Sequence, residues 1–135
     1  MILQSFAPNQ NDDVDKIKYY WSFFMPCAIL LNGGQPYWYF KVRPVFVKLH
    51  KDILLNVRKS LAASLYEVMK LVDMESMENQ AFFIDVLRQF MSDIEEVKAK
   101  VTPNLCLIVG LYPEDQQTQL LTSFIKDALV RLPFV

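Results

Sequence analysis

The chain has 135 residues and a mass of 15.8 kDa, which fits a single domain over residues 1–135 and excludes large catalytic architectures such as an eight-fold barrel. Apolar residues make up 53% of the chain, too large a share for a disordered protein. The formal net charge is -1, so the chain as a whole has no field that would draw it onto nucleic acid or an anionic membrane.

The charges are divided unevenly along the chain. Residues 1–70 carry nine Lys or Arg and five Asp or Glu, whereas residues 71–135 carry five and ten. This division is compatible with a dipolar surface, with a head-to-tail contact between copies, or simply with solvated helix faces of different sign.

The cysteines and the apolar stretches indicate in which cellular compartment the protein is found. Cys27 and Cys106 lie in apolar surroundings and are expected to be reduced and packed as small hydrophobes. Residues 1–10 contain no Lys or Arg and do not resemble a secretory signal. The longest nearly unbroken apolar stretch, residues 19–31, has 13 residues, whereas a membrane-spanning helix needs about 20. We therefore expect a cytoplasmic protein without a membrane span.

The first predicted element is a helix that begins near residues 11–13, where acidic and amide side chains favour a helix N-terminus, and ends at Pro26. Residues 1–13 are the candidate for a loosely ordered segment. The apolar positions of this helix follow helical spacing and are Val14, Ile17, Trp21 and Phe24.

Two β-strands are predicted next, over residues 27–31 and 37–42, because both segments are rich in β-forming residues. Gly33 and Gly34 lie between them and can take the positive φ angles of a hairpin turn. Pro44 has no N–H, so the second strand ends there, bulges, or follows a sheet edge into residues 45–49.

Two helices are predicted to form a central antiparallel hairpin. From residue 52 to residue 72, apolar residues recur at helical spacing and no Gly or Pro interrupts them. Ser76 is the predicted N-cap of the second helix, whose apolar stripe continues to Ile94 and which ends before Pro103.

The last part of the chain predicts a strand and a helix. Residues 105–112 are apolar at almost every position, which is typical of a strand covered on both faces. Pro113 suits the first turn of a helix that continues to Pro133. The predicted fold is therefore α+β, in the order α-β-β-α-α-β-α, with about four helices on a small two- or three-stranded sheet.

Patterns for catalysis or metal binding are scarce. The chain has one histidine, His50, and no C-x-x-C or H-x-x-x-H spacing. A nucleophile pair of Cys27 and His50 stays open only if the fold brings the two together. The carboxylates Asp93, Glu95 and Glu96 are interpreted as a solvated helix face. We therefore expect no enzyme activity, no cofactor and no metal site.

The segment 37–43 is the most distinctive, because it combines four aromatic residues with Lys41 and Arg43. On a strand, Trp38, Phe40 and Val42 would share the face that packs on the helices. The opposite face would combine aromatic and basic side chains, which can stack bases and hold phosphates. That face would consist of Tyr37, Tyr39, Lys41 and Arg43, with Lys48 nearby.

The apolar side chains exceed what four helices on a small sheet can cover, which favours association with a protein partner. We therefore predict a non-catalytic protein-interaction module, either an adaptor or small subunit of a larger assembly or an obligate homo-oligomer. The alternative is a nucleic-acid-binding regulator that uses residues 37–48. The hypothesis of association requires that Trp38, Phe83 and Phe134 are not all buried within the chain itself. The predicted interface residues are Tyr37, Trp38, Tyr39, Lys41, Arg43, Phe82, Phe83, Phe90 and Phe134.

Overall fold

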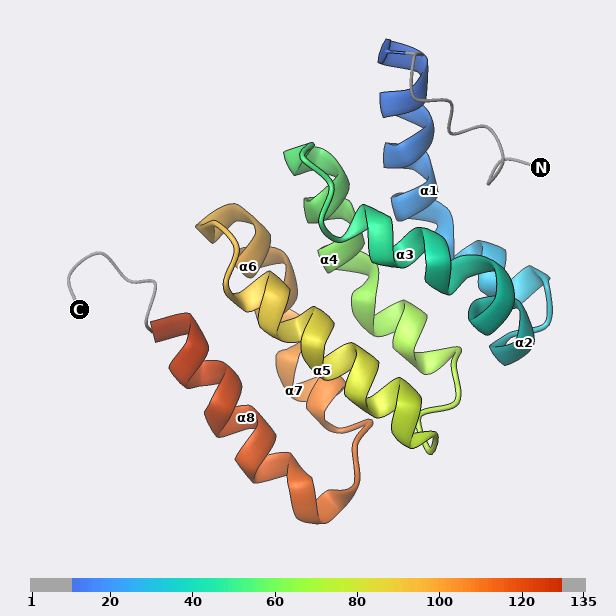
Figure 1. Ribbon diagram of the computed structural model, residues 1–135. Coiled ribbons are helices and arrows are strands. Elements are labelled where there is room, and N and C mark those ends of the chain that lie inside the picture. The colour runs from blue at the N-terminus through green and yellow to red at the C-terminus, as the bar shows by residue number, and fades with distance from the viewer. Residues whose placement is uncertain (1–10, 130–135) are drawn as a thin grey trace.

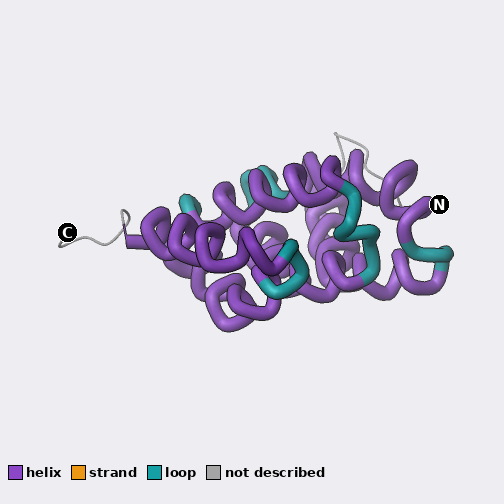
Figure 2. The backbone as a smooth tube through the Cα atoms, turned by 90° about the horizontal axis from the view of Figure 1, so that it is seen from below, coloured by secondary structure: helices purple, strands orange, loops and turns teal. Residues whose placement is uncertain are grey.

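The computed structural model describes residues 11–129, in which every regular element is a helix and none is a strand (Figure 2). The predicted α+β fold with a two- or three-stranded sheet is therefore wrong. In chain order the elements are α1 (Asn11–Leu31), α2 (Gln35–Tyr37), the π-helical turn η2 (Trp38–Val42), α3 (Arg43–Leu49), α4 (Leu55–Lys70), α5 (Met77–Met91), α6 (Glu95–Val101), the 3-10 turn η3 (Thr102–Asn104), α7 (Leu105–Val109) and α8 (Glu114–Leu129).

The helices are stacked in two layers (Figure 1). In one layer α4 packs between α1 and α6, and α7 follows α6; in the other layer α5 packs against α8. Side chains join α3 to α5, since Arg43 Nη1 lies 2.7 Å from Glu78 Oε1 and the Phe46 ring packs edge-on against the Phe83 ring. Helices α1 and α8 therefore lie at opposite ends of the stack.

The two predicted central helices are present, with two differences. Helix α4 covers most of residues 52–72, and the Ser76 hydroxyl caps α5 by accepting the Asn79 backbone N–H at 3.3 Å. The second predicted helix, however, is interrupted at residues 92–94 and divided into α5 and α6. The two helices also lie in different layers, and α4 packs more extensively against α1 and α6 than against α5.

Helix α1 continues through Pro26, where its end was predicted. Proline has no N–H, so the carbonyl of Ser22 loses the donor that an α-helix normally provides four residues later. The Ser64 hydroxyl of α4 lies 3.3 Å from that carbonyl oxygen and shares its single proton between it and the Leu61 carbonyl, at 3.1 Å. Residues 27–31, the first predicted strand, are therefore the last turns of α1.

The other predicted strands are helical as well. Gly33 and Gly34 have the expected positive φ angles of 98° and 78°, but their turn joins α1 to α2. Residues 37–42 and 45–49 belong to α2, η2 and α3, and residues 105–112 form α7 and the turn after it. The order α-β-β-α-α-β-α is thus replaced by an order of helices alone in the described part of the chain.

Pro44 explains the π-helical turn that comes before it. Because Pro44 cannot donate to the Phe40 carbonyl, the α-helical hydrogen bond at this position is missing. The chain widens to the π register instead, with the Arg43 N–H donating to the Trp38 carbonyl.

Aromatic side chains form a buried cluster between η2, α3 and α5. The Trp38 ring stacks on the Phe83 ring at a centroid distance of 5.2 Å and meets the Phe46 and Phe82 rings edge-on, each at 5.6 Å. Trp38, Phe46 and Phe83 have no exposed surface. Because offset and edge-on arrangements are the favoured ring geometries, this cluster ties η2 and α3 firmly to α5.

Arg58 at the start of α4 connects three turns. Its Nε lies 2.8 Å from Asp93 Oδ2 and its Nη2 lies 3.1 Å from Asp93 Oδ1, a bidentate pair. Its Nη1 donates to the carbonyls of Asp52 and Ile53, at 2.9 Å and 3.2 Å. Only 12% of the Asp93 side chain is exposed, so the predicted solvated face is wrong at this residue, whereas the two glutamates of that face are exposed.

Candidate interaction surface

Three of the predicted interface residues lie in the core. Trp38, Phe83 and Phe90 are fully buried, so a partner could reach them only by unfolding the chain, and their assignment to an interface is wrong. They were chosen because the predicted sheet was too small to cover them, and a second layer of helices covers them instead. Phe134 lies outside the described residues.

Three further predicted residues are held within the fold. Arg43 pairs with Glu78, and its guanidinium carbon lies 4.9 Å from the centroid of the Phe82 ring. Phe82 and Tyr37 are half-buried and pack against the core. These side chains hold η2 and α3 against α5, which is a structural role.

The segment 37–48 does not form the strand face that the sequence predicted. Tyr39, Lys41 and Lys48 are exposed, but they lie on successive helical turns rather than along one strand. Phe40, which was predicted to pack on the helices, is 71% exposed. The flat aromatic and basic surface required for stacking bases is therefore absent from this segment.

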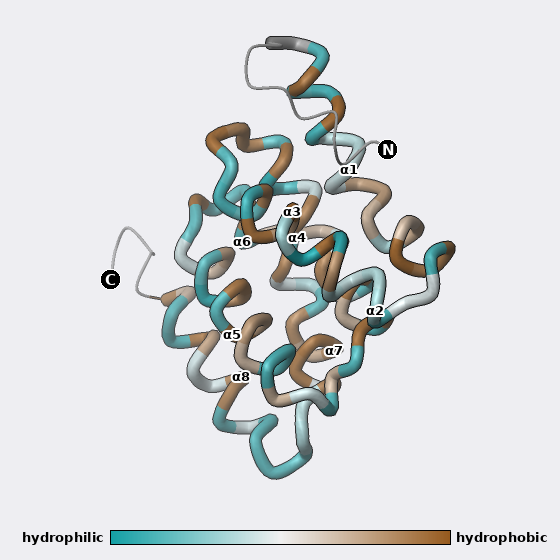
Figure 3. The backbone as a smooth tube through the Cα atoms, turned by 45° about the vertical axis from the view of Figure 1, so that its right-hand side comes forward, coloured by the Kyte–Doolittle hydropathy of each residue, from teal (hydrophilic) through white to brown (hydrophobic). Residues whose placement is uncertain are grey.

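Helix α1 carries more exposed large apolar side chains than any other helix of residues 11–129. Residues 19–31 contain no charged side chain, and this half of α1 is predominantly hydrophobic in Figure 3. A helix that is apolar on all sides is ordinarily buried on all sides. The exposed side chains are Tyr19, Tyr20, Phe23, Phe24, Leu30 and Leu31.

The four exposed aromatic rings of α1 contact one another. Ring centroids are 5.4 Å apart for Tyr19 and Tyr20, 6.4 Å for Tyr19 and Phe23, 6.3 Å for Tyr20 and Phe24, and 4.9 Å for Phe23 and Phe24. Mutual contact restricts the rotation of exposed rings before any partner arrives. Binding therefore costs less side-chain entropy at these residues than it would at isolated rings.

A groove of about 470 Å³ follows the outer side of α1. We call it the α1 groove, and it is lined by Ile17, Tyr20, Trp21, Phe24, Cys27, Ala28 and Leu31. These positions recur every three or four residues over four turns, the spacing with which one helix packs on another. Ser22, Met25 and Ile29 are fully buried on the inner side of the same helix. The α1 groove thus lies beside this inner side, and it is lined both by the core residue Trp21 and by the exposed Tyr20, Phe24 and Leu31.

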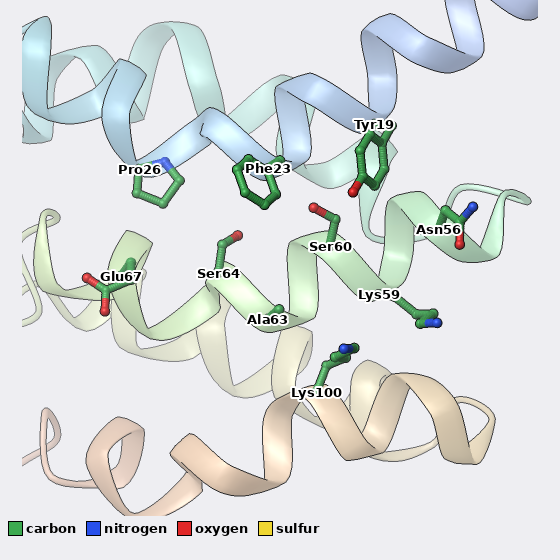
Figure 4. A pocket seen from close by; sticks show the side chains of 10 residues that line it. All are labelled: Tyr19, Phe23, Pro26, Asn56, Lys59, Ser60, Ala63, Ser64, Glu67 and Lys100. Carbon is green, nitrogen blue, oxygen red and sulfur yellow. The ribbon is translucent and has the colours of Figure 1, made fainter.

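A second groove, of about 590 Å³, lies on the other flank of the aromatic rings (Figure 4). Tyr19 and Phe23 form its α1 side, and Ser60 and Ser64 of α4 lie opposite them. The Ser60 hydroxyl is buried without a hydrogen-bond partner and points toward α1 in Figure 4. Because Lys100 of α6 also lines this groove, it is more polar than the α1 groove.

The α1 groove could have been found from the sequence. The heptad spacing of Ile17, Phe24 and Leu31 continues through Pro26, and the same spacing relates Tyr20 to Cys27. Ending the predicted helix at Pro26 concealed this pattern.

His50 and the cysteines do not form the nucleophile pair that the sequence left open. The His50 ring is 6% exposed and packs against the rings of Phe46 and Phe90, at 5.8 Å and 6.2 Å between centroids. No hydrogen bond of the described residues joins it to Cys27. Cys27 and Cys106 are free thiols and both are exposed, so the expectation that they are packed is wrong.

We predict that acid weakens the fold through His50. Burial, with the charge of neighbouring Lys51, lowers the pKa of His50 from 6.5 to about 4. Between these values the unfolded chain takes up a proton that the folded chain does not, so the contribution to stability is full above pH 6.5 and is lost as the pH falls toward 4. Allowing for partial screening by solvent, the free energy of unfolding should fall by about 2 kcal/mol.

Urea unfolding at pH 7 and pH 4.5 measures this effect. His50→Leu removes the titrating group and keeps an apolar side chain in the site, so the variant should lose clearly less stability on acidification than the unaltered chain. Equal losses in the two proteins would contradict the prediction.

Within residues 11–129, His, Cys, Asp and Glu side chains form no cluster of three or more that could hold a metal ion. None of the helices there is both long enough and apolar enough to cross a membrane. Comparison with known proteins found no family model, no curated protein and no solved structure that matches this chain.

Proposed function

We propose that the chain is a non-catalytic protein-interaction module, an adaptor or small subunit of a larger cytoplasmic assembly, that binds its partner through the α1 groove. One observation carries the proposal: Tyr20, Phe24 and Leu31 are 57%, 54% and 77% exposed on a helix whose inner side is fully packed. Single exposed apolar side chains are common on soluble proteins, whereas contiguous ones mark interaction sites. The surplus of apolar side chains inferred from the sequence is thus concentrated on α1 rather than on residues 37–43.

The charge around this surface favours a protein partner over a membrane surface or nucleic acid. Residues 19–31 contain no Lys or Arg, and Lys18 is paired with Asp52 at 3.0 Å. Helices that lie on membranes usually carry basic residues beside the apolar face, and nucleic-acid surfaces need cations to neutralise phosphates. An uncharged aromatic groove is instead typical of the centre of a protein interface.

The size of the exposed rings sets the expected effect of removing them. Tyr20 and Phe24 are rigid aromatic side chains at the middle of the groove, the kind of residue that dominates binding energy. Replacing both by serine should weaken partner binding by about 2 kcal/mol or more, a factor of about 30. Folding should be preserved, because both rings are already more than half exposed.

Affinity capture with a tagged chain in cell extract tests the proposal. The unaltered chain should retain a partner at a defined stoichiometry, the Tyr20→Ser/Phe24→Ser variant should lose it, and circular dichroism should show equal helix content. Ile125→Ser on α8 is the matched control, since Ile125 is 47% exposed at the other end of the stack. Capture that is equal for all three proteins, or the absence of any partner, including an untagged copy of the chain, would reject the proposal.

A further inference from the structure

We propose that the occupant of the α1 groove is the α1 groove of a second copy, so that two chains pair antiparallel through α1 about a two-fold axis at Phe24. This inference rests on the proposed interaction function and adds the identity and geometry of the partner. Three properties of the groove support it: its spacing, its charge and its position in the stack.

The lining positions are arranged symmetrically about Phe24. Ile17 lies seven residues before it and Leu31 seven residues after it. In an antiparallel pair centred on Phe24, each Ile17 therefore meets the Leu31 of the other copy, and the two Phe24 rings meet each other. The same surface is presented by both copies, as a two-fold interface requires.

The inner positions are also complementary in size. Tyr20 and Ala28 lie four residues on either side of Phe24, and Trp21 and Cys27 lie three residues on either side. The antiparallel pair therefore places Tyr20 opposite Ala28 of the other copy, and the exposed edge of the largely buried Trp21 opposite Cys27. Helices approach each other closely when large side chains of one enter the spaces beside small side chains of the other.

The charges allow this pairing. No charged side chain lies between Tyr19 and Leu31, so the contact brings no like charges together. Just beyond the groove, the exposed Lys16 of one copy lies opposite the exposed Asn32 of the other. Neither end of the contact therefore adds electrostatic repulsion.

The opposite end of the stack does not provide an alternative partner. Although Ile125 and Leu129 are about half exposed, the exposed side of α8 is mainly polar. A head-to-tail contact would strip water from these polar groups against an uncharged groove that offers them no partner. The uneven charge of the two halves of the chain therefore does not drive a contact at α1. The polar exposed residues of α8 are Glu114, Asp115, Gln116, Thr118, Gln119, Thr122 and Lys126.

The size of the groove predicts a reversible dimer. Fully exposed aromatic side chains present about 150–250 Å², so Tyr20 and Phe24 together leave roughly 200 Å² uncovered. With Leu31 and the half-exposed remainder, each copy contributes roughly 400–500 Å². The total of roughly 800–1,000 Å² is at or just below the lower limit for a specific interface. We therefore expect dissociation in the micromolar range.

Sedimentation velocity of the purified chain between about 1 and 300 µM tests the pairing. The unaltered chain should convert from monomer to dimer across this range. Phe24→Glu should weaken the dimer at least tenfold, because the two-fold axis brings the introduced carboxylates together, and Ile125→Glu should dimerise as the unaltered chain does. A monomer throughout the range, or a dimer indifferent to Phe24→Glu, would overturn the proposal.

Cross-linking of the native cysteines tests the geometry. Two Cys27 residues would lie about 9 Å apart along the helices and 8–10 Å across them, within reach of a short bismaleimide. A chain with Cys106→Ser should therefore give covalent dimers, whereas Cys27→Ser, which leaves the exposed Cys106 on α7, should not. Covalent dimers through Cys106 alone would place the contact elsewhere and overturn the pairing.

The two proposals can fail separately. If the purified chain stays monomeric while capture in extract depends on Tyr20 and Phe24, the α1 groove binds a different protein, such as an amphipathic helix, and only self-pairing is wrong. If capture also ignores these residues, the interaction function of α1 is wrong as well.

Discussion

Trp38→Ala should lower the free energy of unfolding by about 4 kcal/mol, the largest loss we expect from a single side chain. Trp38 has no exposed surface and packs against three aromatic rings from two other helices. Truncation leaves a cavity between η2, α3 and α5 that rigid rings fill poorly. Urea unfolding followed by circular dichroism measures the loss directly.

Two other variants separate core packing from a surface role. Phe40→Ala changes a neighbouring residue that is 71% exposed, and it should cost less than about 0.5 kcal/mol. Trp38→Phe should cost well under half of the Trp38→Ala loss, because it keeps a ring in the cluster and removes the Nε1 donor, which is buried without a partner. A similar loss from Phe40→Ala and Trp38→Ala would contradict the packing described for η2.

The segment around Trp38 shows how local propensity misled the prediction. Its aromatic and β-branched residues, bounded by two prolines, are typical of a strand. The buried positions, however, are Trp38, Val42, Phe46 and Leu49, which are three or four residues apart and follow the period of a helix. Packing against α5 makes this segment helical rather than extended. Because α5 lies far along the chain, the residues around Trp38 alone do not reveal that packing.

Helix α1 depends on a contact that the sequence does not reveal. Pro26 is a sound reason to end a helix unless another group replaces the missing donor. A partial replacement comes from the shared hydroxyl of Ser64, which is 42 residues away from Ser22 in the chain. The heptad spacing of the α1 groove therefore crosses a proline that, taken by itself, predicts the end of the helix.

Helices α4 and α5 were predictable because several features of their own sequences independently indicate a helix. Each has a sustained apolar stripe, and α5 has a hydroxyl cap at Ser76. Residues 105–112 carry no such redundancy, since a short apolar run fits a buried strand and a buried helix equally well. The burial of Leu105, Ile108 and Val109 shows the helical spacing only in retrospect.

Arg58→Met should lower the free energy of unfolding by about 3 kcal/mol. The substitution keeps most of the side chain's length but removes both hydrogen bonds to Asp93 and those to the carbonyls of Asp52 and Ile53. It leaves the Asp93 carboxylate, which is 12% exposed, without its cation. Breaking a largely buried pair on one side costs more than the pair itself contributes, because the remaining charge is uncompensated.

The pair between Lys59 and Glu96 provides the control. Their charged atoms are 3.6 Å apart and Glu96 is 61% exposed, so Lys59→Met should change stability by less than about 0.5 kcal/mol. Adding Asp93→Asn to Arg58→Met should recover part of the loss, since it removes the uncompensated charge while keeping a side-chain oxygen for the Ile94 N–H. If Asp93→Asn instead adds its full cost to that of Arg58→Met, the two side chains are not coupled. The turn at residues 52–53 and the turn at Asp93 would then be held together by apolar packing alone.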